Sequence, residues 1–190
     1  MANVAPFEVV AGPCDVYFAP TGTTFPATTA APGTAWRKVG YTEGGVKVGS
    51  PQTIVELRCD QTTGPIKSIR SEENLEVTFD IASVTLENYA LALNQAIAGP
   101  DSGTHDKSVK LYRGGFQVET LALLCRNDHL SPYADAPLQY EAPVVFQAGN
   151  PEVDHVRDNK SVLACTFHAI VDPDAAPGEE FGSVRAGDGS

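Results

Sequence analysis

Hydrophobic and polar residues alternate along several short stretches of the chain, and such alternation predicts β-strands with one buried face. The clearest alternation spans residues 75–81. Its apolar residues, which we predict to face the core, are Leu75, Val77, Phe79 and Ile81. Its polar residues, which we predict to face water, are Glu76, Thr78 and Asp80.

Directly after this strand the apolar spacing becomes that of a helix. The apolar positions at i, i+3, i+4, i+7 and i+11 are Leu86, Tyr89, Ala90, Leu93 and Ile97. Thr85 stands where an N-cap hydroxyl belongs, and Glu87 places a carboxylate in the first turn, where the helix dipole favours it. The Ala98-Gly99-Pro100 sequence predicts that the helix ends there. We therefore predict one helix over about residues 85–98, with Leu86, Tyr89 and Leu93 facing the core.

Shorter alternating or apolar runs predict further strands on both sides of this pair. They span residues 14–19, 39–41, 46–48, 53–60, 109–113, 116–126, 138–148 and 161–171. The Gly44-Gly45 and Gly114-Gly115 pairs are typical of tight turns, and Pro143 indicates an edge or a bulge. The last run puts Leu163, Cys165, Phe167 and Val171 on one side. About eight strands and one helix predict a mainly β fold, a β-sandwich or barrel with one flanking α-helix.

The length of 190 residues suits one core. We expect residues 14–173 to form a single β-sandwich domain, preceded by an extended arm at residues 1–13. Residues 20–35 are rich in Thr, Ala, Pro and Gly and predict a long surface loop. Residues 174–190 form an acidic tail without periodicity, which we expect to be disordered in the isolated chain.

The net charge of −11 argues against a protein that grips nucleic acid, because phosphate binding needs clustered cations. The only adjacent basic pair is Arg37-Lys38. The acidity alone is equally explained by solubility. The sequence contains no run of 18 apolar residues, so it predicts no membrane span. The first residues also lack the features of a signal peptide. We therefore expect synthesis in the cytoplasm.

Candidate chemistry is sparse. Three histidines in polar loops stand beside aspartates: His105, His129 and His155. Such pairs on loops are usually solvated rather than catalytic. Cys165 and His168 are three residues apart on a strand, so they point to opposite faces and cannot share a metal. The cysteines have no CxxC spacing, which favours buried free thiols at Cys14, Cys59, Cys125 and Cys165. We predict no enzyme activity, no metal and no cofactor.

Three segments together resemble the major tail tube proteins of long-tailed, siphovirus-type bacteriophages. The first runs from Trp36 through Val-Gly-x-Thr-x-Gly-Gly-Val to Val46. The second is SEENLEVTFDIASVTLENYALALN, in which a strand enters a Thr-Leu-Glu-Asn helix, and the third is TFHAIVDP at residues 166–173. The resemblance covers about residues 14–173 in order. One departure is Ser83-Val84, where family members often carry an acidic residue.

The resemblance implies a structural virion protein made in the host cytoplasm. Six subunits would form a ring, rings would stack into a tube, and genomic DNA would pass through the lumen into the host. The implied partners are further copies, a tape measure protein in the lumen, and the tail terminator and distal tail proteins. DNA would pass transiently and without specific binding.

A tube gives the polar strand faces a role. The residues expected to line its lumen are Glu56, Arg58, Asp60, Glu76, Thr78 and Asp80. An acidic lumen would repel DNA and let it slide. The segments expected to join rings are the N-terminal arm, the loop at residues 20–35, the connection at residues 49–53 and the acidic tail, whose deletion should weaken stacking while the monomer stays folded. Two alternatives stay open: another phage β-sandwich module, such as a decoration, baseplate or adhesin protein, and a β-rich hydrolase without a familiar motif.

Overall fold

The elements of the chain are nearly all strands. The computed structural model describes residues 10, 12–95, 101–102, 107–111, 115–127, 137–153, 155 and 157–187. Its helix is α1 (Leu86–Ala92). Its strands are β1 (Asp15–Pro20), β2 (Arg37–Lys38), β3 (Thr42–Gly49), β4 (Gln52–Leu57), β5 (Lys67–Glu73), β6 (Glu76–Ile81), β7 (Asp101–Ser102), β8 (Lys107–Ser108), β9 (Leu121–Asn127), β10 (Leu138–Gln147), β11 (Leu163–Ala169) and β12 (Ser183–Ala186). The predicted mainly β fold with one helix is confirmed.

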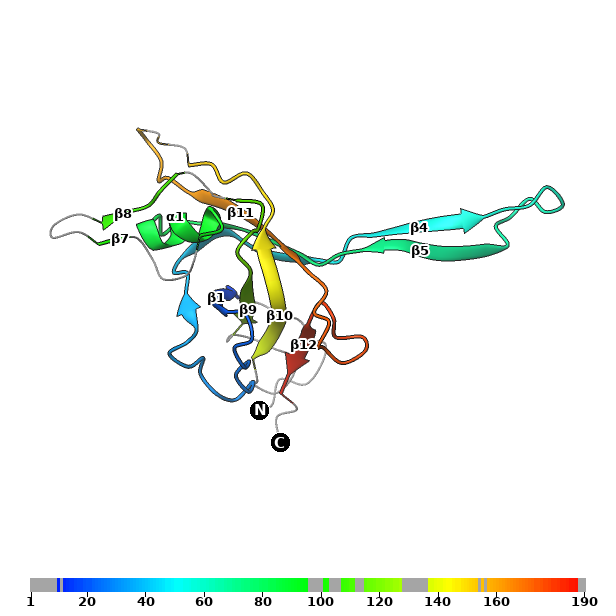
Figure 1. Ribbon diagram of the computed structural model, residues 1–190, viewed down its shortest axis with the longest axis horizontal. Helices are drawn as coiled ribbons and strands as arrows, with labels where there is room; N and C mark the ends of the chain where they lie inside the picture. The colour runs from blue at the N-terminus through cyan, green and yellow to red at the C-terminus, as the bar shows by residue number, and fades with distance from the viewer. Residues whose placement is uncertain are drawn as a thin grey trace, which may run out of the picture.

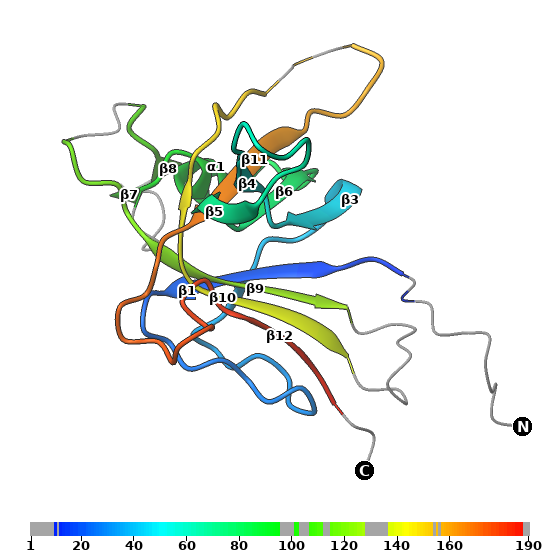
Figure 2. The same cartoon turned by 90° about the vertical axis from the view of Figure 1, so that its right-hand side faces the viewer.

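The main sheet is antiparallel and folds over on itself into two layers. Its strand order is β2-β1-β9-β10-β11-β6-β3, and β12 pairs with the first half of β10. Figure 2 shows β1, β9, β10 and β12 in one layer and β3, β6 and β11, with α1, in the other. Apolar residues on the facing sides of the layers therefore meet, as in a β-sandwich.

Three phenylalanines hold the two layers together. The ring of Phe18 on β1 lies 4.7 Å from that of Phe167 on β11 and 6.4 Å from that of Phe79 on β6. The rings of Phe79 and Phe167 stack at 5.8 Å. All three are almost completely buried. The alternation that predicted strands at residues 75–81 and 161–171 is therefore the alternation between this core and water.

Two β-bulges interrupt the sheet. Gly44 and Gly45 lie inside β3 rather than in a turn, so the predicted hairpin there is wrong. Their φ angles are +71° and +85°, and the register moves from Glu43 opposite Asp80 to Val46 opposite Phe79. Two glycines can adopt this left-handed backbone without a steric penalty. The bulge predicted from Pro143 is confirmed, because the pairing of β10 with β9 shifts between Ala142 and Val145.

The helix begins as predicted but ends early. The hydroxyl of Thr85 accepts a hydrogen bond from the backbone N–H of Asn88, as an N-cap does. The helix ends at Ala92, because Asn94 adopts a left-handed φ of +54°. The Asn94 side-chain amide donates a hydrogen bond to the Gln147 carbonyl at 2.7 Å and accepts one from the Gln147 backbone N–H at 2.7 Å. These two bonds tie the turn to β10. Residues 96–98 of the predicted helix lie outside the described residues.

Strands β4 and β5 form a separate two-stranded sheet that projects from the body (Figure 1). Every residue of both strands is exposed. The half-buried strand predicted at residues 53–60 is therefore wrong in two respects. It ends at Leu57, and its apolar residues Val55 and Leu57 are each 41% exposed, because no second layer covers them.

Several other predicted boundaries change. The strand predicted at residues 116–126 begins only at Leu121, and the last predicted strand ends at Ala169, which leaves Val171 53% exposed. Residues 39–41 and 109–111 are not strands. Residues 1–9 of the predicted arm and residues 112–114 of the predicted second hairpin lie outside the described residues.

The acidic tail joins the sheet. The prediction of disorder is wrong for residues 183–186, which form β12 and pair with β10. Phe181, just before this strand, packs against the main core. The contact of Phe181 and the pairing with β10 therefore dock a segment whose composition alone indicates disorder.

Candidate assembly surfaces

The outer face of the β3–β6–β11 layer is a polar, partly exposed surface, which we call the polar sheet face. Its residues alternate with the buried phenylalanine positions and are brought together by the strand register. They are Glu43, Lys47, Glu76, Thr78, Asp80, Thr166 and His168. All are partly exposed.

Charges on the polar sheet face are weakly paired. Lys160 Nζ lies 3.0 Å from Glu43, and His168 Nε2 lies 3.8 Å from Glu76. Such half-exposed pairs contribute little to stability. Beneath the face, burial raises the pKa of the Cys165 thiol to about 12, and the charge of Asp80 adds to that shift. The polar sheet face is therefore hydrated and carries more acidic than basic side chains, while the residues beneath it form an apolar core.

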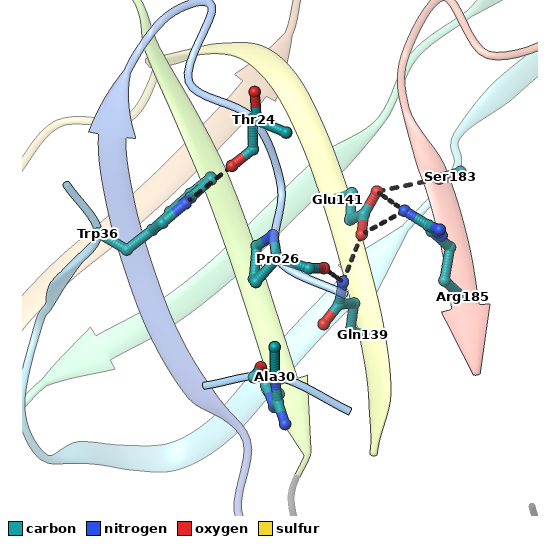
Figure 3. Close-up of polar contacts among 9 residues, drawn as sticks. Thr24, Pro26, Ala30, Trp36, Gln139, Glu141, Ser183 and Arg185 are labelled. Atoms are coloured by element: carbon teal, nitrogen blue, oxygen red, sulfur yellow. Dashed lines mark hydrogen bonds and ion pairs between the residues drawn. The ribbon is translucent and has the colours of Figure 1, made fainter. Parts of the chain in front are cut away.

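The opposite outer face, on β1 and β9, is covered by the long loop between β1 and β2. Trp36, 7% exposed, packs with Phe25 at 5.0 Å between ring centroids, over Ala122 and Leu124 of β9. The Trp36 indole N–H donates to the carbonyl of Thr24 at 3.2 Å (Figure 3). This loop, which the sequence predicts to lie on the surface, thus covers one face of the sheet.

Buried polar side chains of the sheet hold this loop in place. The Gln139 amide donates to the carbonyl of Pro26 at 2.8 Å, and Arg126 donates to the carbonyls of Thr28 and Ala30. Gln139 and Arg126 are buried, so the loop carbonyls supply acceptors to donors that the fold withdraws from water. Hydrophobic patterning could not have found these two residues, because they are polar at core positions.

Glu141 connects the sheet to β12. Its carboxylate is 7% exposed and accepts from the Gln139 amide, from Ser183 at 3.5 Å and from Arg185 at 3.4 Å (Figure 3). The backbone approaches so closely here that a Cβ on Gly182, whose φ is +113°, would overlap the Glu141 carbonyl oxygen. Glycine is therefore required where the tail crosses β10.

The β4–β5 hairpin has two different faces. The register pairs Val55 with Ile69 and Leu57 with Lys67 on one side of the ribbon. Val55, Leu57 and Ile69 thus form a contiguous patch, which we call the apolar hairpin face, and each is 41–42% exposed. An isolated hairpin is only marginally stable in water, and an uncovered apolar face makes it less stable still.

The other side of the hairpin is polar. Arg70 bonds to Gln52 at 2.8 Å and to Glu73 at 2.8 Å, and Arg58 bonds to Glu56 at 2.7 Å. Ile54 also lies on this side, paired with Arg70 and next to the Glu56–Ser68 pair. The ribbon is therefore amphipathic across its thickness.

An apolar groove of about 830 Å³ lies at the root of the hairpin, beside the C-terminal segment. We call it the tail groove. Its lining includes Leu75, Tyr140, Val171, Phe181 and Val184, with Glu180 as an acidic member. Val171 and Val184 are exposed by 53% and 60%. Three of these residues come from the segment expected to be disordered: Glu180, Phe181 and Val184.

The six predicted lumen residues do not share one surface. Glu76, Thr78 and Asp80 lie together on the polar sheet face, as their alternation predicts. The other three lie on or beside the projecting hairpin: Glu56, Arg58 and Asp60. The strand that carries the second set belongs to a different sheet, so the idea of a common wetted face is wrong.

Most predicted core residues lie in the core. The buried ones are Val77, Phe79, Ile81, Leu93 and Phe167, and the partly buried ones are Leu75 and Tyr89. Leu86 is an exception, because it is 41% exposed.

The cause of this exception is a buried asparagine on α1. Asn88 accepts from Arg37 at 2.9 Å and donates to the carbonyls of Val39 and Ser83 at 2.8 Å each. The helix therefore turns Asn88, Leu91 and Ala92 inward rather than Leu86. Burial lowers the pKa of Arg37, and the nearby charge of Glu87 offsets part of that shift.

Little of the described chain has catalytic or metal-binding geometry. Among the described residues no three His, Cys, Asp or Glu side chains gather as a metal site. His155 meets Ser161 at 3.2 Å in the open, and His105 and His129 lie outside the described ranges. In the described part of the chain, no helix is long and apolar enough to cross a bilayer.

All four cysteines are free thiols, but they are not all buried. Cys125 and Cys165 are buried, whereas Cys14 and Cys59 are partly exposed. Cys59 lies just beyond β4 in the hairpin, and hydrogen bonds from Thr62 and Gln61 lower its pKa. The expectation of burial is wrong for Cys59 because its strand carries no core face.

Comparison with known proteins gives one match. A family model described as phage tail tube protein matches residues 1–124, about two thirds of the chain. The match includes β1 to β6 and α1, and therefore the hairpin and two strands of the polar sheet face. A comparison with curated proteins finds no similar sequence.

Proposed function

This chain belongs to the phage tail tube protein family, and from that premise we propose that six copies close into a ring and that rings stack into the tube through which phage DNA passes. As a member of this family it is a structural protein of the virion tail. The observation that carries the proposal is the contrast between the two outer sheet faces. One is covered by the loop around Trp36, whereas the residues of the other, the polar sheet face, stay at least partly exposed.

The polar sheet face lines the lumen in this arrangement. Glu43, Glu76 and Asp80 bring three carboxylates to it, against Lys47 and Lys160, which pairs with Glu43 at 3.0 Å, and Thr78 lies at its centre. DNA carries about one negative charge per 1.7 Å, and cationic contacts repeated along a tube would hold it. Carboxylates repel the phosphates instead and let the duplex slide.

The edge of the sheet supports closure of a ring. β3 is the last strand in the sheet order, so one of its edges has no strand partner among the described residues. An open edge is a hazard in a monomer, but it joins subunits when a neighbour continues the sheet. Glu56, Arg58 and Asp60 sit on or beside the projecting hairpin, so in this arrangement they do not line the lumen with the polar sheet face.

The tube implies further partners. A tape measure protein would fill the lumen before DNA does, and a tail terminator and distal tail proteins would bind the two ends. Synthesis and assembly would occur in the host cytoplasm. None of these contacts needs a cofactor.

Electron microscopy of the purified full chain tests the proposal. We expect hollow tubes or stacked rings in negative stain, and a reconstruction with the polar sheet face inside. A chain that stays monomeric at high concentration and binds a glycan or capsid protein would instead support a decoration or adhesin module. A basic or apolar lumen in the map would refute the placement of Glu76 and Asp80.

A further inference from the structure

Two of the apolar surfaces formed by the described residues lack cover, and they differ in shape. The apolar hairpin face is a patch of Val55, Leu57 and Ile69 on a projecting ribbon. The tail groove is a concave site of about 830 Å³ with a mainly apolar lining, within the size range of pockets that enclose a ligand. A projecting apolar ribbon and a concave apolar groove are complementary.

We propose that the apolar hairpin face of one copy docks into the tail groove of a second copy, an inference that rests on the proposed self-assembly. The hairpin does not fill its own groove. Only its root, at Arg70 and Glu73, takes part in the lining, while the apolar hairpin face does not. Figure 1 shows the ribbon directed away from the body, so the occupant has to come from another molecule.

Charge favours the same pairing. Lys67 lies on the apolar hairpin face, paired across the ribbon with Leu57. The lining of the tail groove includes the carboxylate of Glu180 and the Arg70–Glu73 ion pair, in which Arg70 already neutralises Glu73 at 2.8 Å. A cation that arrives with the apolar patch therefore meets the carboxylate of Glu180, whereas the opposite hairpin face carries its own internal ion pairs.

The contact can build an assembly that grows. The hairpin and the groove are different surfaces, so a one-directional, head-to-tail contact leaves one free hairpin and one free groove on every dimer. Such a contact repeats until it closes into a ring or continues as a filament, as the proposed tube requires. A two-fold dimer with two reciprocal hairpin-to-groove contacts would instead be a closed assembly that does not grow.

Substitution of the two sides tests the contact. We expect Ile69→Asp and Val184→Asp each to weaken association by about 30-fold or more, the effect of removing a buried anchor. The matched control is Ile54→Asp, the same substitution on the polar side of the same ribbon, which should assemble as the wild type does. Val171→Asp is a second groove variant in case Val184→Asp disturbs β12.

A mixing experiment identifies the surfaces directly. The Ile69→Asp chain keeps an intact groove, and the Val184→Asp or Val171→Asp chain keeps an intact hairpin. At a concentration where the wild type assembles and the variants do not, each should be monomeric alone, and an equimolar mixture should form a 1:1 dimer in sedimentation velocity, because mixing restores one hairpin-to-groove contact.

The outcomes separate the two proposals. If the wild type forms tubes but Ile69→Asp forms them as readily as Ile54→Asp, or if the mixture stays monomeric, the hairpin-to-groove contact is wrong while the tube remains. A wild-type chain that never assembles overturns both.

Discussion

Strands β5 and β6 follow each other in one stretch without Gly or Pro, yet β5 is exposed to solvent and β6 packs one face against the core. All seven residues of β5 are exposed, whereas β6 alternates strictly between partly buried and buried positions. Both are antiparallel strands with regular partners. Strand formation and burial are therefore separate outcomes, and only the second requires another layer.

The change of environment occurs over two residues. The Asn74 N–H donates to the carbonyl of Pro51 at 3.0 Å, which closes the hairpin. The next carbonyl, of Leu75, accepts from Ala169 N–H at 2.9 Å, which places the chain in the main sheet. A switch of backbone partner at this junction separates the ribbon from the body.

The largest expected effect comes from truncating the core side. Phe79→Ala should lower the free energy of unfolding by about 3–5 kcal/mol, because it removes a buried ring that touches two others. Ile69→Ala, on the exposed ribbon, should change it by no more than about 0.5 kcal/mol. Urea unfolding of the dilute, unassembled chain measures both. Equal losses would mean that the hairpin is part of the cooperative unit.

A smaller effect tests whether the C-terminal segment belongs with the body or with the ribbon. Gly182→Ala should cost about 2–4 kcal/mol, from backbone strain and from the overlap with the Glu141 carbonyl. Gly45→Ala is the control, because its φ is also positive but no atom lies within 4 Å of its added Cβ. It should cost about 1–2 kcal/mol. Thermal unfolding compares the two, and equal losses would show that β12 is dispensable to the body.

The same comparison changes the expected result of deleting residues 174–190. From the sequence alone, a folded monomer with weaker stacking is the expected result. Because Phe181 packs on the core and β12 pairs with β10, we now expect such a deletion to destabilise the monomer as well.

The smallest effect on stability, and the sharpest local readout, comes from the thiols. The pKa of Cys59 in the hairpin is lowered, whereas burial raises that of Cys165 to about 12. At pH 8 a thiol reagent should therefore modify Cys59 within the folded chain and Cys165 only after unfolding. Peptide mass spectrometry after timed labelling follows both sites. Rapid modification of folded Cys165 would show that the sheet opens more readily than its packing indicates.

Local signals in the sequence predicted several elements correctly. Period-two patterning located β6 and most of β11, the Thr85 hydroxyl marked the start of α1, and Pro143 indicated the bulge in β10. Each of these depends on neighbours close in sequence, or on a face whose partner is generic. That is why single-residue rules were sufficient for them.

Other features depend on contacts between distant residues. The Gly44-Gly45 pair has the sequence of a turn but forms a bulge, because β6 continues alongside β3 past it. Asn88 is buried because the side chain of Arg37 and the carbonyls of Val39 and Ser83 surround it, and of these three only Ser83 is close in sequence. The helix therefore buries Asn88 and leaves Leu86 exposed. No local pattern contains this information.

The sequence by itself determined that the chain is a mainly β protein, which residues of β6 and β11 face a core, and which family the chain resembles. Only the tertiary structure decided that β4 and β5 leave the body, that the acidic tail returns to pair with β10, and that Glu56 and Glu76 lie on different surfaces. The physical reason is the same in each case. Alternation encodes two faces of a strand, but whether a face meets a second layer, water or another copy depends on where the rest of the chain lies.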